Sequence, residues 1–125
     1  MAAKDNYKIM VMPHFHWDRA WFESFQNFRV GLVEMMDHLL DVFDRRPEYK
    51  FNLDGQTVIL EDYLEIRPQE KERIQHYVQE GRLSIGPWYV LPDEKIPSGE
   101  SHIRNLLLGQ HVAKDFGPSA RIGYS

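Results

Sequence analysis

The stretch "YKIMVMPHFHWDRAW", residues 7–21, bears on both the fold and the candidate site. Its first half is a short apolar run ending at Pro13, which is typical of a strand buried on both faces of a parallel sheet. Its second half places His14, His16 and Asp18 at a spacing of two. Alternate residues of an extended chain share one face, so these polar side chains can converge while the intervening aromatic residues enter the packing. The stretch predicts a buried strand with a polar site at its carboxyl end.

The rest of the chain alternates between strand and helix patterns. Apolar residues recurring three and four apart predict helices, and proline or glycine marks where they stop. The expected elements are strands at 7–13, 49–53, 82–86 and 120–125, and helices at 28–46, 58–67, 68–81 and 100–116. This order is typical of right-handed βαβ units around a parallel sheet. We therefore expect an α/β fold, a parallel-sheet (β/α) barrel-type catalytic domain represented by about its first four β/α units.

The end of the sequence bears on domain organisation. Functional groups in parallel α/β folds collect at the carboxyl ends of strands, and the last expected strand coincides with the last residues. We expect residues 1–125 to be the N-terminal portion of a larger catalytic domain. Unclosed sheet edges tend to pair with other chains, so we also expect self-association through exposed edges.

Composition excludes several classes of partner and site. The net charge is -4 with both signs interspersed, which argues against nucleic acid or a membrane surface as a partner. There is no cysteine, so a metal would need histidine and carboxylate ligands. The N-terminal apolar run is too short for a signal-peptide core, and a cytoplasmic location is the expectation.

Histidine nitrogen and carboxylate oxygen are ligands that Zn²⁺ accepts, and a catalytic zinc takes about three of them from the protein. His14, His16 and Asp18 could supply two or three, with others from later strand ends. A structural or chance role for the histidine pair is the competing interpretation. Trp21 also has two interpretations, because a tryptophan beside polar groups serves either in a core or as a flat surface on which a sugar packs.

The motif "HFHWDRAW" resembles the His-x-His-x-Asp-x-x-Trp signature that opens the catalytic domain of glycoside hydrolase family 38, the retaining α-mannosidases. Further segments resemble that family in the same order. They are "FNLDGQTVILEDYLEIRP", "GRLSIGPWYVLPDE", "SGESHIRNLLLGQ" and "RIGYS". One departure is Pro87, where the family more often has glycine before the tryptophan.

The resemblance implies roles for particular residues. Zn²⁺ would be held by His16 and Asp18, with an aspartate nucleophile and a later histidine beyond Ser125 as the other ligands. No catalytic residue is then expected within this chain. Trp21 would line the pocket for the sugar, and His14 would orient a ligand.

Two carboxylates that follow strands have simpler alternatives. Asp93 is a candidate neighbour of the site, although a solvated pair with Glu94 is the competing interpretation. Asp54 is most simply a turn residue, because it precedes Gly55 at the end of an expected strand.

The implied function is that of a zinc-dependent retaining α-mannosidase acting on an α-mannoside or a mannose-containing oligosaccharide. These 125 residues alone are expected to be inactive. One alternative is a metal-dependent amidohydrolase or phosphoesterase barrel, which would need ligands at later strand ends, whereas the remaining histidines fall in expected helices: His38, His76, His102 and His111. The other alternative is a non-catalytic metal- or sugar-binding module.

Overall fold

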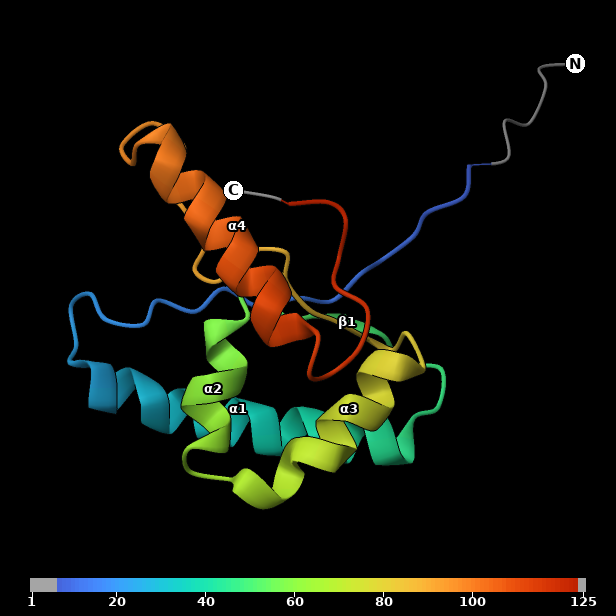
Figure 1. Ribbon diagram of the computed structural model, residues 1–125. Helices are drawn as coiled ribbons and strands as arrows, with labels where there is room; N and C mark the ends of the chain where they lie inside the picture. Colours follow the sequence, from blue (N-terminus) through green and yellow to red (C-terminus); the bar gives the residue numbers. More distant parts are fainter. Residues whose placement is uncertain (1–6, 124–125) are drawn as a thin grey trace, which may run out of the picture.

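The computed structural model describes residues 7–123 of the chain (Figure 1). The elements in chain order are α1 (Phe25–Arg45), β1 (Phe51–Asn52), α2 (Val58–Leu64), the 3-10 turn η1 (Pro68–Glu70), α3 (Lys71–Gln79), β2 (Leu83–Ser84) and α4 (Gly99–Ala113). Within this part of the chain, no helix is both long and apolar enough to span a membrane.

The sheet is parallel, which confirms the α/β class. Phe51 of β1 pairs with Leu83 of β2, and Asn52 pairs with Ser84. Between the two strands the chain crosses over through α2, η1 and α3, as a βαβ unit requires. Among residues 7–123 the sheet has two short strands, so this part of the chain supports a parallel α/β fold without displaying a barrel.

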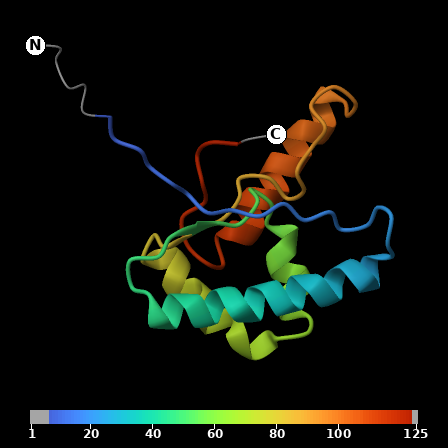
Figure 2. The ribbon, with the colours of Figure 1, turned by 180° about the vertical axis from the view of Figure 1, so that it is seen from behind.

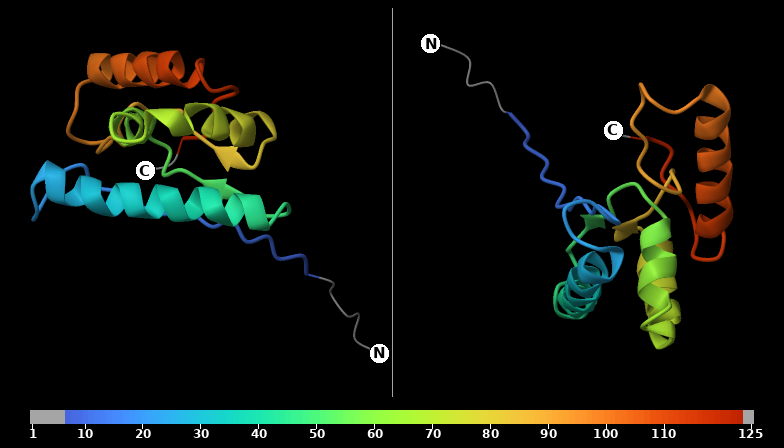
Figure 3. Two further views of the ribbon diagram at one scale, coloured as in Figure 1. Left: turned by 90° about the horizontal axis from the view of Figure 1, so that it is seen from below. Right: turned by 90° about the vertical axis from the view of Figure 1, so that its left-hand side faces the viewer.

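The helices lie in layers around this small sheet. α1 and the α2–α3 pair lie side by side on one side of the strands, and α4 lies alongside the α2–α3 layer (Figure 3). The core between α1, α2 and the strands is formed by fully buried side chains, among them Met36, Leu40, Ile59, Leu53 and Ile85. Figure 2, which views the molecule from behind, shows α1 in front, running across the molecule below β1.

The helix boundaries follow local capping chemistry. α1 begins three residues earlier than expected because the Ser24 side chain accepts a hydrogen bond from the Asn27 N–H. Ser98 caps α4 in the same way by accepting from the Ser101 N–H. The expected helix 68–81 is divided, because Pro68 opens a 3-10 turn before α3 starts at Lys71.

The expected first strand, 7–13, is not a strand in the structure. Residues 7–12 lead away from the helices (Figure 1), and Ile9 and Val11 are 85% and 83% exposed. Pairing begins only where Pro13 O accepts from the Asn52 N–H at 2.9 Å and His14 bridges to Asn52 in parallel. A strand requires a hydrogen-bonded partner along its length, and β1 offers only two residues.

The expected fourth strand, 120–125, is also wrong for its described part. Residues 120–123 are irregular, although the Ala120 N–H donates to Ile85 O at 2.8 Å and so lies beside the end of β2. One hydrogen bond does not make a ladder. Residues 124–125 lie outside the described residues.

The loops after β1 and β2 run side by side and form the floor of the candidate site. Gly55 O accepts from the Trp88 N–H at 3.1 Å, and the Thr57 N–H donates to Trp88 O at 2.9 Å. A parallel bridge joins Gln56 to Trp88. This pairing continues the direction of the sheet past its strands and places the polar groups of both loops at its carboxyl end.

Candidate active site

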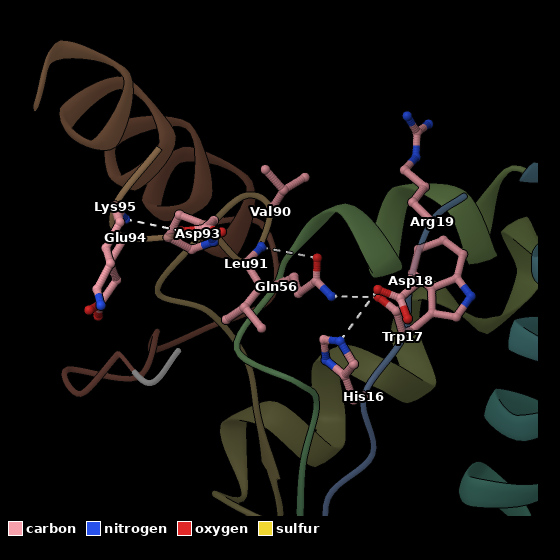
Figure 4. Close-up of a pocket in the computed structure, with 11 residues that line it drawn as sticks. His16, Trp17, Asp18, Arg19, Gln56, Val90, Leu91, Asp93, Glu94 and Lys95 are labelled. Atoms are coloured by element: carbon pink, nitrogen blue, oxygen red, sulfur yellow. Dashed lines mark hydrogen bonds and ion pairs between the residues drawn. The ribbon is translucent and has the colours of Figure 1, made fainter. Parts of the chain in front are cut away.

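An open pocket of about 660 Å³ lies at the carboxyl end of the sheet. One wall is formed by residues 16–19 together with Gln56, and the other by residues 90–95 (Figure 4). This volume falls in the range of about 300–1,000 Å³ that small-molecule sites occupy. The pocket thus joins the histidine segment to the loop that follows β2.

His16 and Asp18 face each other in this pocket. His16 Nε2 and Asp18 Oδ1 are 3.4 Å apart, and both side chains are partly exposed. Trp17, between them in sequence, points the other way and is 6% exposed in the core. The alternation expected from an extended segment is present here even though the ladder is not.

Asp54 holds the His16 ring from behind. This aspartate is fully buried, and its Oδ1 lies 3.1 Å from His16 Nδ1. Its Oδ2 accepts a 2.9 Å hydrogen bond from the Trp17 N–H. The hydrogen bond that His16 makes to Asp54 raises the pKa of His16 most, burial lowers it, and the charges of Asp54 and Asp18 add to the increase.

Gln56 joins the two walls of the pocket. Its amide nitrogen donates to Trp17 O at 2.9 Å and to Asp54 Oδ2. Its amide oxygen accepts from the Leu91 N–H at 3.1 Å. One buried side chain therefore connects the histidine segment, the turn after β1 and the loop after β2 (Figure 4).

Arg19 sits at the rim of the pocket in a fixed position. Its guanidinium makes two hydrogen bonds to Asp62 of α2, at 2.8 and 3.0 Å, and lies 4.5 Å from the Phe25 ring centre. A bidentate pair to a nearly buried carboxylate limits the rotamers of the arginine. The next residue after Asp18 is thereby anchored to a helix.

His14 and Trp21 lie outside the lining of this pocket. The exposed His14 has its Nδ1 3.4 Å from Phe15 O. Trp21 is 77% exposed and packs against Phe22, which in turn meets the edge of Phe28. The structure thus brings His16 and Asp18 together and leaves the other two expected residues of the motif at a distance from that pair.

Asp93 and Glu94 line the wall opposite His16. Asp93 Oδ1 accepts from the Lys95 N–H at 3.0 Å, which is the hydrogen bond of a local turn. Both carboxylates are exposed. This arrangement agrees with a solvated carboxylate pair, and Asp93 is also one of the residues that line the pocket.

The other histidines lie where the helical pattern put them. His38 is in α1, His76 in α3, and His102 and His111 are in α4. Among residues 7–123, no group of three or more histidine and acidic side chains is arranged to hold a metal ion.

The two facing donors nevertheless fit one Zn²⁺. Ligand atoms at about 2.1 Å from a tetrahedral zinc are about 3.4 Å from each other. The separation of His16 Nε2 and Asp18 Oδ1 is 3.4 Å. Zinc-bound histidines also commonly donate their second ring N–H to a carboxylate, the position that Asp54 occupies here.

The sequence does not predict two residues of this site. The pattern places Asp54 in a turn, and its φ of 45° followed by Gly55 at 66° shows that the turn is present. Asp54 also lies two residues after β1 of the parallel sheet, and that position is a usable signal for a site residue. No sequence signal marked Gln56, whose contacts depend on three segments meeting.

Fold and site together define a class: α/β proteins with a polar site at the carboxyl end of parallel strands. Within that class, the chain belongs to glycosyl hydrolases family 38. The model of that family's N-terminal domain matches residues 6–125. This agrees with the resemblance carried by the motif HFHWDRAW and the four segments that follow it.

Several proteins of this family are similar to the chain. A putative mannosylglycerate hydrolase of Halalkalibacterium halodurans is 45% identical over 116 residues, covering 91% of this chain and 13% of the relative. An alpha-mannosidase of Saccharomyces cerevisiae is 34% identical over 110 residues, covering 86% and 10%. The crystal structure of an alpha-mannosidase from Enterococcus faecalis superposes with a TM-score of 0.86 at 42% identity, covering 90% of this chain and 13% of that one. The chain therefore spans about an eighth of these relatives or less.

Proposed function

We propose that this chain supplies the zinc-binding histidine segment, residues 14–18, of a retaining α-mannosidase that hydrolyses terminal α-mannosyl residues. The observation that carries the proposal is the His16–Asp18 pair, 3.4 Å apart in the pocket and backed by the buried Asp54. Family membership and relatives described as alpha-mannosidases support the substrate class.

In this proposal His16 Nε2 and Asp18 Oδ1 hold the metal from one side. When bound, Zn²⁺ supplies a template for sugar hydroxyls and stabilises charge. The chain's own residues orient the donors: Asp54 fixes the ring of His16, and Arg19 anchors the segment to α2. Trp21 is proposed to contact the sugar, with His14 and Asp93 near the ligands.

Retaining glycosidases need two carboxyl groups about 5 Å apart, one as nucleophile and one as acid/base. We place both, with the remaining zinc ligands, in further residues of a longer protein. This is supported by the chain's coverage of only 13% of the alpha-mannosidase of known structure. The 125 residues alone are then inactive on mannosides.

The proposal is tested on a longer protein that contains this chain. His16→Ala and Asp18→Ala should each lower hydrolysis of an aryl α-mannoside by more than the roughly 10–100-fold typical of losing a group that orients a ligand. Asp115→Ala, at an exposed carboxylate, is the matched control and should keep full activity. Full activity in both ligand variants would refute the proposal.

Metal binding is tested on the chain itself. Calorimetric titration with Zn²⁺ should show weak binding, because the chain contributes two donors where a closed site uses four. Asp18→Ala should abolish that binding and Asp115→Ala should not. Tight stoichiometric binding that survives Asp18→Ala would place the ligands elsewhere.

A panel of substrates should distinguish specificity for the α-mannosyl group from specificity for the group to which it is linked. The 45% identical relative is described as a putative mannosylglycerate hydrolase, so we include mannosylglycerate beside α-linked mannose disaccharides. Hydrolysis of any of them supports the α-mannosyl specificity. Hydrolysis of β-mannosides alone would contradict it.

A further inference from the structure

We infer that Asp54 is a positioning residue: its buried carboxylate keeps the proton of neutral His16 on Nδ1 and thereby leaves Nε2 unprotonated and turned toward Asp18. The role in metal binding rests on the proposed function, since it takes Nε2 as the ligating atom. The tautomer itself can be measured without any metal.

The carboxylate of Asp54 is held in one orientation. Its Oδ1 faces His16 Nδ1 at 3.1 Å, and its Oδ2 accepts from the Trp17 N–H at 2.9 Å and from the amide of Gln56. The side chain is fully buried. Because a buried charge without partners is costly, these donors fix the carboxylate in place.

Turn formation does not account for this side chain. The left-handed backbone of Asp54 suits the turn into Gly55, but asparagine adopts that conformation as readily. The side chain instead reaches a segment 38 residues earlier in the chain and contacts two successive residues there. Its contacts are directed at the histidine segment.

The chemistry of the contact decides the tautomer. An ionised carboxylate only accepts hydrogen bonds, so the facing Nδ1 must carry a hydrogen. In the neutral ring the other nitrogen, Nε2, is then free of hydrogen and can donate its lone pair. Asp18 Oδ1 is also an acceptor and faces Nε2, but it is 3.4 Å away and partly exposed, whereas Asp54 is fully buried and 3.1 Å from Nδ1. Asp54 is therefore the carboxylate that keeps the hydrogen of the neutral ring, and the Nε2 lone pair lies at the pocket.

Asp54→Asn separates this role from the turn. The asparagine oxygen can keep the hydrogen bonds from Trp17 and Gln56, which leaves its NH₂ facing His16 Nδ1. Nδ1 then has to accept, and the ring proton moves to Nε2. The shape and the turn are unchanged while the tautomer is reversed.

The experiment is long-range proton–nitrogen NMR of the metal-free, 15N-labelled chain at a pH well above the ordinary pKa of histidine. His16→Gln identifies the ring signals among the six histidines. We expect Nδ1–H in the native chain, Nε2–H in Asp54→Asn, and the native pattern in Asp115→Asn, the same charge change at an exposed site. Thermal unfolding checks that each variant is folded.

Nε2–H in the native chain, or an unchanged tautomer in a folded Asp54→Asn, would overturn the inference. A second readout is Zn²⁺ affinity by calorimetry, where Asp54→Asn should weaken binding about 10–100-fold. If the tautomer reverses but neither chain binds Zn²⁺, the positioning role stands and the zinc part of the proposed function fails. If both bind Zn²⁺ equally despite reversed tautomers, Asp54 still sets the tautomer, but its role in metal binding is overturned.

Discussion

At the scale of single residues, the surroundings of Tyr89 raise the pKa of its phenol. Burial, followed by a hydrogen bond to Glu61, raises the pKa of this phenol from 10.0 to about 12. Both causes favour the protonated form, since the low dielectric disfavours phenolate and the nearby carboxylate repels it. Tyr89 lies on the loop that walls the pocket and packs against the core.

This shift predicts an alkaline effect on stability. The folded pKa lies above the unfolded value, so the contribution is fully present below pH 10.0 and is lost as the pH rises toward about 12. The free energy of unfolding should fall across that window less steeply in Tyr89→Phe than in the native chain. Phenolate absorbance should show a late-titrating component that Tyr89→Phe removes; removal of an early one would contradict the assignment.

At the scale of elements, two helical glycines have opposite environments. Gly31 lies in α1, and a Cβ added to it would have no atom of another residue within 4 Å, apart from its own helix and chain neighbours. A Cβ on Gly109 of α4 would lie 2.3 Å from Pro87 O and 2.4 Å from the carbonyl carbon of Trp88. Glycine at position 109 is therefore what lets α4 approach the loop after β2.

Replacing these two glycines by alanine should change the free energy of unfolding in opposite directions. Gly31→Ala should stabilise the chain by about 0.5–1 kcal/mol, the usual gain from replacing glycine inside a helix. Gly109→Ala should destabilise it, by about 1–3 kcal/mol, because backbone atoms must shift to admit the methyl group. Urea unfolding of the two variants beside the native chain measures both. Equal stabilisation in the two would show that α4 does not pack against this loop.

At the scale of the whole molecule, the first described residues form one continuous run of exposed apolar side chains, residues 9–12. Apolar residues in the strands and directly after them are buried, namely Phe51, Leu53, Leu83 and Ile85, whereas residues 9–11 are all at least 83% exposed. Burying one such large side chain contributes roughly 1.5–3 kcal/mol. Several together provide a driving force for association through the segment ahead of Pro13.

We therefore expect the chain to self-associate in a concentration-dependent manner. Replacing Ile9 and Val11 by lysine should reduce that association without changing the melting temperature, because neither side chain contributes to the core. Sedimentation velocity over a range of concentrations measures it, with Lys8→Ala as a control in the same segment. A native chain that remains monomeric with a cooperative melt would contradict both this expectation and the unclosed sheet from which it came.

Much of the architecture could be predicted from local pattern alone. The apolar periodicity found α1 and α4, Pro68 and Gly81 bounded the helical segment between the strands, and the alternation of elements indicated a parallel sheet. Helix starts were displaced by a few residues because side-chain caps such as Ser24 decide them. The predictions of strands at 7–13 and 120–125 were wrong, because an apolar run does not show whether another strand lies beside it to pair with.

For the candidate site, local spacing is enough to predict the pair of donors in the histidine segment. The spacing of two puts His16 and Asp18 on one side of an extended segment, whatever lies around it. The residues that hold these donors in place, Asp54 and Gln56, become neighbours of the histidine segment only in the folded chain. Asp54 and Gln56 act through contacts between segments 35 to 39 residues apart, and such contacts exist only once β1, its turn and the loop after β2 have come together. Spacing along the chain specifies which side chains share a face, whereas burial and hydrogen-bond partners belong to the folded arrangement.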